Sequence, residues 1–222
     1  MGLHHPNIVK LMATTKTDTY ILLANEYIHG DNLERILHNA NSIVQISNED
    51  KLYVGLEVMQ AMQYIHSKNI IHQDIKPANI LVEARTKKTL LTDWGMANIR
   101  IAICPDMYEK IGPSGGTVAY MAPECLMQGK PANKMSDMWS IGATVVELFT
   151  KQKPWTTYTE MFHNMFLKQV PRPLALMNLK QLPLLKSCFS YEPKQRPSAA
   201  DMVVAIKNME GVDLVKRYGY AW

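Results

Sequence analysis

The amino-acid sequence predicts an α+β fold that is mostly helical, with a small β-sheet near the N-terminus. Two short apolar runs, 8–13 and 20–26, are separated by a polar turn and indicate strands. Farther along, apolar residues recur at helical spacing in segments 48–68 and 136–149. A polar stretch, 72–79, lies between apolar runs and is typical of a loop that presents polar side chains to a ligand.

The length and composition are those of a globular protein. The 222 residues are 47% hydrophobic and 20% charged, which is enough for one sizeable core or two small ones. The 24 basic and 20 acidic residues leave a net charge of +4, too small and too evenly spread to indicate binding to nucleic acid or to a membrane surface. No uncharged apolar run approaches the roughly 20 residues of a membrane span, so we expect none. The sequence predicts no particular oligomeric state.

The three cysteines, Cys104, Cys125 and Cys188, are an odd number at unrelated spacings. This pattern favours reduced thiols over a disulfide framework. We therefore expect a cytoplasmic protein, with the nucleus as the alternative compartment.

The first long helix is predicted over 48–68. Ser47 and Asp50 form a plausible capping pair before its apolar positions. His66 lies near the end of the segment, and we interpret it as a helix-end cap rather than a ligand. The helix delivers the chain to the polar loop at 72–79.

Short strands are expected around the polar loop. Ile70 and Ile71 precede it and 80–82 follow it, which indicates a strand on each side. A further apolar pair at 90–91 precedes Asp93, which indicates another strand that ends in a turn.

The second half of the chain is predicted to be helical. After helix 136–149, the segments 158–168 and 179–189 have helical character, and a last helix follows a turn at 193–198 and runs to Met209. The tail, 211–222, is short and rich in basic and aromatic residues, and the sequence assigns it no role.

Polar residues of the loop carry the candidate chemistry. Asp74, Lys76 and Asn79 lie within six residues, and Asp93 comes to a turn after the next strands. Phosphoryl transfer needs a group that orients a hydroxyl and charges that neutralise phosphate and magnesium. Asp74 suits the first task and Lys76 the phosphate, and Asp93 and Asn79 offer the oxygen ligands that magnesium prefers.

The motifs resemble those of the protein kinase family. His-Gln-Asp-Ile-Lys-Pro-Ala-Asn at 72–79 is similar to its catalytic loop, and Asp-Trp-Gly at 93–95 to its metal loop. Ala-Pro-Glu at 122–124, Asp-Met-Trp-Ser-Ile-Gly at 137–142 and Arg196 match further family motifs in the expected order. Gln73 departs from the usual Arg, and Trp94 from the usual Phe.

The resemblance implies a kinase-like fold. We expect a remnant of the N-lobe β-sheet with the hinge at 1–30, a mostly helical C-lobe at 31–210 and the tail at 211–222. It also implies ATP and Mg²⁺ as cofactors and proteins with Ser or Thr acceptors as substrates.

The resemblance assigns a role to each matched position. In the nucleotide site, the backbone of Glu26 and Ile28 would bind the adenine edge, Asn32 or Asp31 would face the ribose, and Leu81 would contact the nucleotide. In the catalytic set, Asp74 would be the base, Lys76 would contact the transferring phosphate, and Asn79 and Asp93 would bind magnesium. Thr117 would bond both Asp74 and Lys76 and position the substrate, which with Lys76 favours a Ser/Thr acceptor.

Further residues are implied to have structural roles. Asp137 would be buried and would accept hydrogen bonds from the loop backbone, holding His72 to Asp74; the alternative is an N-terminal helix cap. Arg196 would form a buried ion pair with Glu124; the alternative is a solvated surface Arg. Trp94 would pack beneath the N-lobe helix, which we expect this chain to lack, leaving an exposed apolar patch.

We expect a Ser/Thr protein kinase that transfers phosphate from ATP. The alternative is a truncated, non-catalytic interaction module, because the 222 residues include no counterpart of the family's Gly-rich loop, strand Lys and helix Glu. The resemblance places an activation segment between Asp-Trp-Gly at 93–95 and Ala-Pro-Glu at 122–124. Gln73 carries no charge to pair with this segment when it is phosphorylated. We therefore predict that activity does not require phosphorylation of that segment.

Overall fold

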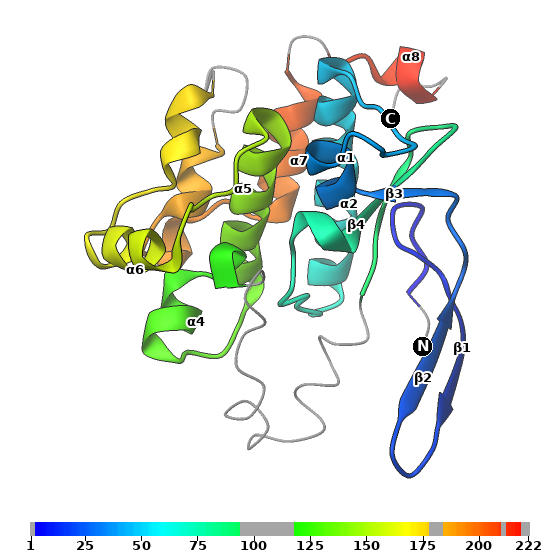
Figure 1. The fold of residues 1–222 in the computed structure, drawn as a ribbon, viewed down its shortest axis with the longest axis horizontal. Helices are drawn as coiled ribbons and strands as arrows, with labels where there is room; N and C mark the ends of the chain where they lie inside the picture. The colour runs from blue at the N-terminus through cyan, green and yellow to red at the C-terminus, as the bar shows by residue number, and fades with distance from the viewer. Residues whose placement is uncertain (1–2, 94–117, 178–183, 210–211, 219–222) are drawn as a thin grey trace.

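The computed structural model describes residues 3–93, 118–177, 184–209 and 212–218. It confirms an α+β fold with a mostly helical body (Figure 1). The strands are β1 (Leu11–Lys16), β2 (Ile21–Asn25), β3 (Gly30–Asn32), β4 (Ile80–Glu83) and β5 (Thr89–Leu91). The α-helices are α1 (Leu33–His38), α2 (Asn48–Ser67), α4 (Pro123–Gln128), α5 (Lys134–Thr150), α6 (Tyr158–Phe166), α7 (Ala199–Lys207) and α8 (Leu214–Tyr218). The short 3-10 helices are η1 (Pro77–Asn79), η3 (Val118–Tyr120), η4 (Arg172–Leu176), η5 (Lys186–Phe189) and η6 (Pro193–Gln195).

The strands form two separate antiparallel sheets. β1 and β2 make a hairpin that projects from the helical body (Figure 1), whereas β3, β4 and β5 form a three-stranded sheet in that order. Gly30 begins β3 opposite Glu83, and a Cβ there would lie 2.0 Å from the Val82 carbonyl oxygen, so only glycine fits this pairing. The small sheet places β3, which follows the hairpin, beside β4, which follows the candidate catalytic loop.

The strand predicted at 8–13 begins three residues later, at Leu11. Ile8 and Val9 instead lie beside β5, where the Val9 N–H donates to the Leu91 carbonyl at 3.0 Å. These two residues are buried, each 4% exposed, and every residue of β1 is exposed. The apolar run is therefore divided between the core and the hairpin.

The strand predicted at Ile70 and Ile71 is absent, which corrects that prediction. Asn69 has a left-handed backbone with φ +57°, and its N–H donates to the His66 carbonyl. The Ile70 N–H donates to the Ile65 carbonyl at 3.0 Å. These two bonds are the pattern that commonly closes a helix C-terminus, so the chain reverses at this point instead of extending.

Two long helices form the centre of the body. The predicted capping pair of α2 is confirmed, since Ser47 accepts from the Asp50 N–H and Asp50 accepts from the Ser47 N–H. Helix α5 begins at Lys134, two residues before the predicted start, because Asn133 caps it. Trp139 of α5 is fully buried, and α2 packs against α5, α7 and β5.

Other helix predictions differ in extent. Of the predicted helix 179–189, the described part is a turn at 184–185 followed by η5. Helix α6 ends at Phe166 and α7 at Lys207, both short of the predicted ends. Helices α1, α4 and α8, like strand β3, were not predicted from the sequence.

Candidate active site

A buried carboxylate holds the start of the catalytic loop. Asp137, in the first turn of α5, is 1% exposed. It accepts hydrogen bonds from the backbone N–H groups of His72 and Gln73, each at 2.9 Å. Since Asn133 caps α5, the alternative role of Asp137 as the cap is wrong. We expected His66 to cap the end of its own helix. Its Nε2 instead lies 2.9 Å from Asp137, which corrects that expectation.

His72 begins the loop and is fully buried. Its Nε2 lies 3.0 Å from the Thr92 carbonyl, and its Nδ1 accepts from the Asp74 N–H at 3.3 Å. These partners suit a neutral ring that carries its proton on Nε2. Burial lowers the pKa of His72 from its ordinary value of 6.5, which also favours the neutral form. His72 thus joins the catalytic loop to the segment that leads to Asp93.

Three candidate catalytic side chains meet at Asp74. Its Oδ2 lies 2.9 Å from Lys76 Nζ and 3.0 Å from Asn79 Nδ2, and the same amide donates to the Asp74 carbonyl oxygen at 2.7 Å. Asp74 is 8% exposed, and the Lys76 side chain is 20% exposed. The carboxylate is therefore buried and fixed by two donors, one of which, Lys76, keeps part of its side chain exposed.

The second acid is brought close by a backbone contact. The Thr92 N–H donates to the Asn79 carbonyl at 3.0 Å, and Asp93 follows, exposed, with a left-handed φ of +70°. Both hydrogen bonds of the Asn79 side-chain NH2 go to Asp74, and the side-chain oxygen Oδ1 has no hydrogen bond among the described residues. Asp93 and the Asn79 amide oxygen are thus hard oxygen donors on adjoining segments.

This donor set fits magnesium. Magnesium is usually held by one or two carboxylates together with substrate phosphates and water rather than by a complete protein cage. Within the described residues, no group of three or more His, Cys, Asp or Glu side chains is arranged to hold a metal ion. A carboxylate and an amide oxygen on adjoining segments are compatible with a magnesium ion that is also bound by nucleotide phosphates.

The predicted adenine contacts lie between β2 and β3. The Glu26 N–H donates to the Lys10 carbonyl at 2.9 Å, and Glu26 Oε1 accepts from the Lys10 N–H at 2.7 Å, so Glu26 continues the hairpin pairing. Ile28 is half-buried, and its N–H has no hydrogen bond within the described residues. A donor is therefore available at Ile28.

The predicted ribose and nucleotide contacts adjoin each other. Asn32 lies opposite Leu81 in the β3–β4 register, and both are half-buried. Asn32 Oδ1 accepts from the Arg35 N–H and so caps α1. Asp31, the alternative to Asn32, is buried, and its carboxylate accepts from Ser42 and from the Ile43 N–H. Of the two, Asn32 is the more accessible.

The predicted ion pair between Arg196 and Glu124 is present and buried. Arg196 Nη1 lies 2.6 Å from Glu124 Oε1, and Nη2 lies 2.7 Å from Oε2. Two further N–H groups are also used, since Nε donates to the Ser190 carbonyl and Nη1 to the Met135 carbonyl. The Arg196 side chain has no exposed surface, so the alternative of a solvated Arg is wrong.

Two predicted residues, Trp94 and Thr117, lie outside the described residues. Their proposed packing and substrate contacts stay predictions. Gln73 is described, has a left-handed φ of +69° and is held through its N–H by Asp137.

Sequence reasoning missed a buried cluster at Glu147. This residue of α5 has no exposed surface, accepts from the Tyr120 hydroxyl at 2.5 Å and lies 2.7 Å from His38 Nε2. Burial and the adjacent carboxylate raise the pKa of Tyr120, so it donates as a neutral phenol. An acid within an otherwise apolar helix segment was the available signal. The cluster joins α1, α5 and the residues before α4.

The comparisons with known proteins agree with this geometry. A family model described as the protein kinase domain matches residues 1–205. The chain is 31% identical over 207 residues to mitogen-activated protein kinase kinase kinase A of Dictyostelium discoideum, which covers 91% of this chain and 21% of that protein. It is 30% identical over 210 residues to serine/threonine-protein kinase CTR1 of Arabidopsis thaliana, covering 90% and 24%. It is also 30% identical over 233 residues to serine/threonine-protein kinase mos of Patiria pectinifera, covering 98% and 65%.

The chain belongs to the protein kinase domain family. It spans about a fifth of the length of the first relatives it matches, such as the Dictyostelium kinase at 21%. Of the helices in the described part of the chain, none combines the length and apolar character needed to cross a membrane.

Proposed function

We propose that this chain carries the catalytic loop of a Ser/Thr protein kinase that transfers the γ-phosphate of ATP to protein hydroxyl groups. The observation that carries the proposal is the fixed carboxylate of Asp74, held at 2.9 Å by Lys76 and at 3.0 Å by Asn79. Relatives whose names include serine/threonine-protein kinase support the acceptor class. Lys76, two residues after Asp74, supports it as well.

In the proposed reaction, Asp74 orients the acceptor hydroxyl and takes its proton. The hydroxyl oxygen forms a bond to the γ-phosphorus, the bond from that phosphorus to the β–γ bridging oxygen breaks, and ADP leaves. Lys76, already beside Asp74, provides a point charge for the transferring phosphate. The buried Asp137 keeps the loop backbone in place, so little reorganisation is needed when substrate binds.

Asn79 and Asp93 are the proposed magnesium ligands. When bound, magnesium neutralises charge on the phosphates. The two Asn79 N–H contacts to Asp74 turn the amide so that its oxygen is available as a ligand. Ile28, Asn32 and Leu81 are the proposed nucleotide contacts, together with the backbone of Glu26.

One observation favours the alternative function, a non-catalytic interaction module. All residues of β1 and β2 are exposed, including Met12 at 60% and Leu22 at 57%. Exposed apolar surface of this kind is typical of interaction sites. The two proposals differ in whether Asp74 matters for chemistry.

The test compares phosphate transfer by the purified chain and by Asp74→Asn, using radiolabelled ATP and casein as acceptor. We expect the substitution to lower the rate at least about 100-fold, because it removes the base and leaves the fold intact. The exposed Glu192→Gln is the matched control and is expected to act like the parent. Phosphoamino-acid analysis should find phosphoserine or phosphothreonine. Equal rates for the parent and Asp74→Asn would refute the catalytic proposal and favour the interaction module.

A further inference from the structure

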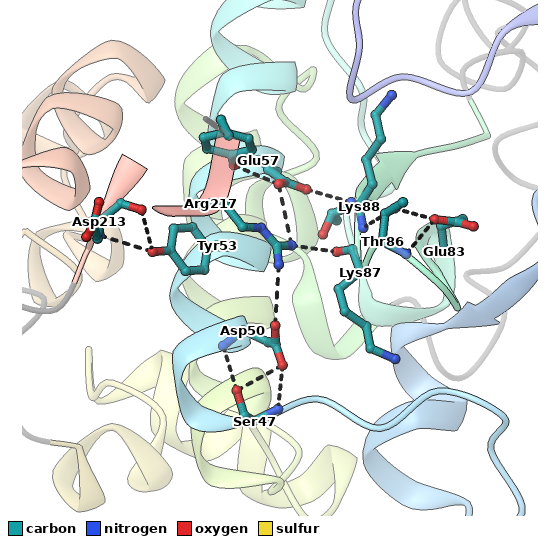
Figure 2. Close-up of polar contacts among 12 residues, drawn as sticks. Ser47, Asp50, Tyr53, Glu57, Glu83, Thr86, Lys87, Lys88, Asp213 and Arg217 are labelled. Atoms are coloured by element: carbon teal, nitrogen blue, oxygen red, sulfur yellow. Dashed lines mark hydrogen bonds and ion pairs between the residues drawn. The ribbon is translucent and has the colours of Figure 1, made fainter. Parts of the chain in front are cut away.

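The C-terminal helix α8 lies outside the residues matched by the family model and is docked on α2 (Figure 2). Arg217 reaches Asp50 at 3.5 Å and donates to the Lys87 carbonyl at 3.0 Å, with its guanidinium 4.9 Å from the centre of the Tyr53 ring. The Tyr53 hydroxyl in turn bonds both the N–H and the carbonyl of Asp213 at 3.0 Å. Helix α8 is therefore held to α2 and to the turn between β4 and β5.

Glu57 is the buried centre of this contact. It lies on α2 and is 2% exposed. One carboxylate oxygen, Oε1, accepts from the Tyr218 hydroxyl at 2.7 Å and lies 3.8 Å from Arg217. The other, Oε2, accepts from the backbone N–H of Thr89 at 2.6 Å. Burial raises the pKa of Glu57, and this cost is offset in part by these three partners. One side chain thus joins α8 to the first residue of β5.

Strand β5 leads directly to the candidate metal loop. Thr89 is the first residue of the strand, and Asp93 lies four residues after Thr89. The opposite side of the strand is held by Asn7, whose side-chain amide donates to the Thr89 carbonyl at 2.9 Å. Beyond the strand, Thr92 bonds both Asn79 and His72. The position of Asp93 is therefore set by how β5 is fixed at its start and by how Thr92 is fixed at its end.

We propose that Glu57 is a positioning residue for the active site, which couples the docking of α8 to the placement of Asp93 through β5. This inference rests on the proposed kinase function. Glu57 touches neither substrate nor metal, and it acts through the Thr89 N–H. Glu57 makes two contacts that matter here, one to the Thr89 N–H and one to the Tyr218 hydroxyl. Through the bond to Tyr218, helix α8 would also contribute to the position of Asp93.

Substitutions can separate the contact of Glu57 with the Thr89 N–H from its contact with the Tyr218 hydroxyl. The contact borders a cavity of about 780 Å³ whose lining includes His5, Tyr64, Lys88 and Tyr218. Tyr218→Phe removes only the hydroxyl donor and keeps the ring that covers Glu57. Glu57→Gln keeps an oxygen for Thr89 and can donate to the Tyr218 hydroxyl oxygen. Glu57→Leu keeps the approximate volume but leaves the Thr89 N–H without an acceptor.

The first measurement is amide hydrogen exchange, followed residue by residue by NMR without nucleotide. We expect Glu57→Leu to speed exchange at Thr89 and Thr92 at least about tenfold, the effect of losing one buried hydrogen bond. Glu57→Gln should restore most of the protection, and the exposed Glu192→Gln should not change it. Unchanged exchange at Thr89 in Glu57→Leu, or an equal increase throughout α7, would overturn the inference. If Glu57→Leu does not fold, Tyr218→Phe is measured in its place, with a smaller increase at Thr89 expected.

The second measurement is the Mg²⁺ concentration that gives half-maximal binding of ATP, taken well below the unfolding temperature. We expect it to rise in Glu57→Leu, to return toward the parent value in Glu57→Gln and to rise by a smaller factor in Tyr218→Phe. A loss of global stability alone would lower Tm without changing this Mg²⁺ dependence. If Tyr218→Phe leaves both measurements at parent values, α8 has no part in the coupling. A parent chain that binds no Mg²⁺ and ATP would refute the proposed function, and exchange at Thr89 and Thr92 would then decide the coupling alone.

Discussion

Arg196 and Glu124 lie 72 positions apart and form a bidentate pair inside the protein. A buried guanidinium is tolerated only when its donors and its charge are both satisfied. Here the carboxylate takes two N–H groups, and the carbonyls of Ser190 and Met135 take others. The pair therefore ties α4 to the turn before α7, and its role is structural.

Breaking this pair from one side should destabilise the protein strongly. Arg196→Met leaves the Glu124 carboxylate buried without its partner, and we expect a loss of about 3–5 kcal/mol in the free energy of unfolding. Urea unfolding followed by circular dichroism measures it. The double variant Arg196→Met with Glu124→Met is the control and should recover part of the loss. A single variant within about 0.5 kcal/mol of the parent, as for an exposed pair, would contradict this view.

The buried imidazole of His72 gives stability a dependence on pH. Because burial lowers its pKa below 6.5, the unfolded chain binds a proton that the folded protein does not. The stability from neutral His72 is present above pH 6.5 and is lost as the pH falls through the lowered pKa. His72→Gln cannot titrate, so the stability difference between the parent and this variant should shrink from pH 8 toward pH 5. Urea unfolding across this range measures it, and a constant difference would show that His72 does not contribute.

Helix α2 is the element to which the most distant parts of the chain attach. Its start has a reciprocal Ser47–Asp50 cap, and the chain turns at Asn69, just after the helix ends. Between these ends, Glu57 reaches β5 and α8, and His66 reaches Asp137. A helix with this many polar contacts needs a fixed start, since a frayed first turn would release Asp50 from Arg217.

Removing the cap of α2 should have a moderate effect. Ser47→Ala leaves the Asp50 N–H without its acceptor, and we expect a loss of about 1 kcal/mol in the free energy of unfolding. Thermal unfolding measures this change. Ser47→Thr keeps the hydroxyl that accepts from the Asp50 N–H and donates to the Asp50 carboxylate, and it should retain most of the stability. An Ala variant as stable as the parent would mean that water replaces the hydroxyl.

The whole molecule divides into a packed helical body and an exposed hairpin. The core is built around α2, α5 and α7, and the three-stranded sheet lies against it. The hairpin of β1 and β2 joins this body through residues 7–10 and the segment after Asn25 (Figure 1). Two strands without a covered apolar face are only marginally stable in water.

The hairpin should therefore open more readily than the rest of the sheet structure. We expect backbone amides of β1 and β2 to exchange at least about 100-fold faster than those of β4 and β5, because local opening there exposes no buried apolar surface. NMR exchange on the nucleotide-free chain measures both sets. A dilution series is the control, since a second copy covering the hairpin would slow exchange at high concentration. Equal protection at all concentrations would contradict the division into body and hairpin.

The proximity of the candidate catalytic residues was predictable from local order. Asp74, Lys76 and Asn79 lie within six residues, so the chain itself brings them together, and the long helices have periodic apolar positions. Ile70 and Ile71 were misjudged because an apolar pair alone does not distinguish a strand from a helix end. The left-handed backbone of Asn69 decided between them.

By itself, the sequence determined the family, the proximity of Asp74, Lys76 and Asn79 and the positions of the main helices. These features depend on ordered motifs, on neighbours within a few residues and on periodicity. Only the tertiary structure decided that Glu57 joins β5 to α8, that Glu147 gathers His38 and Tyr120, and that Ile8 leaves its strand for the core. The physical reason is that these contacts join residues 27 to 161 positions apart, so no local sequence pattern records them. A buried carboxylate reveals its partners only when packing brings their donors within hydrogen-bond distance.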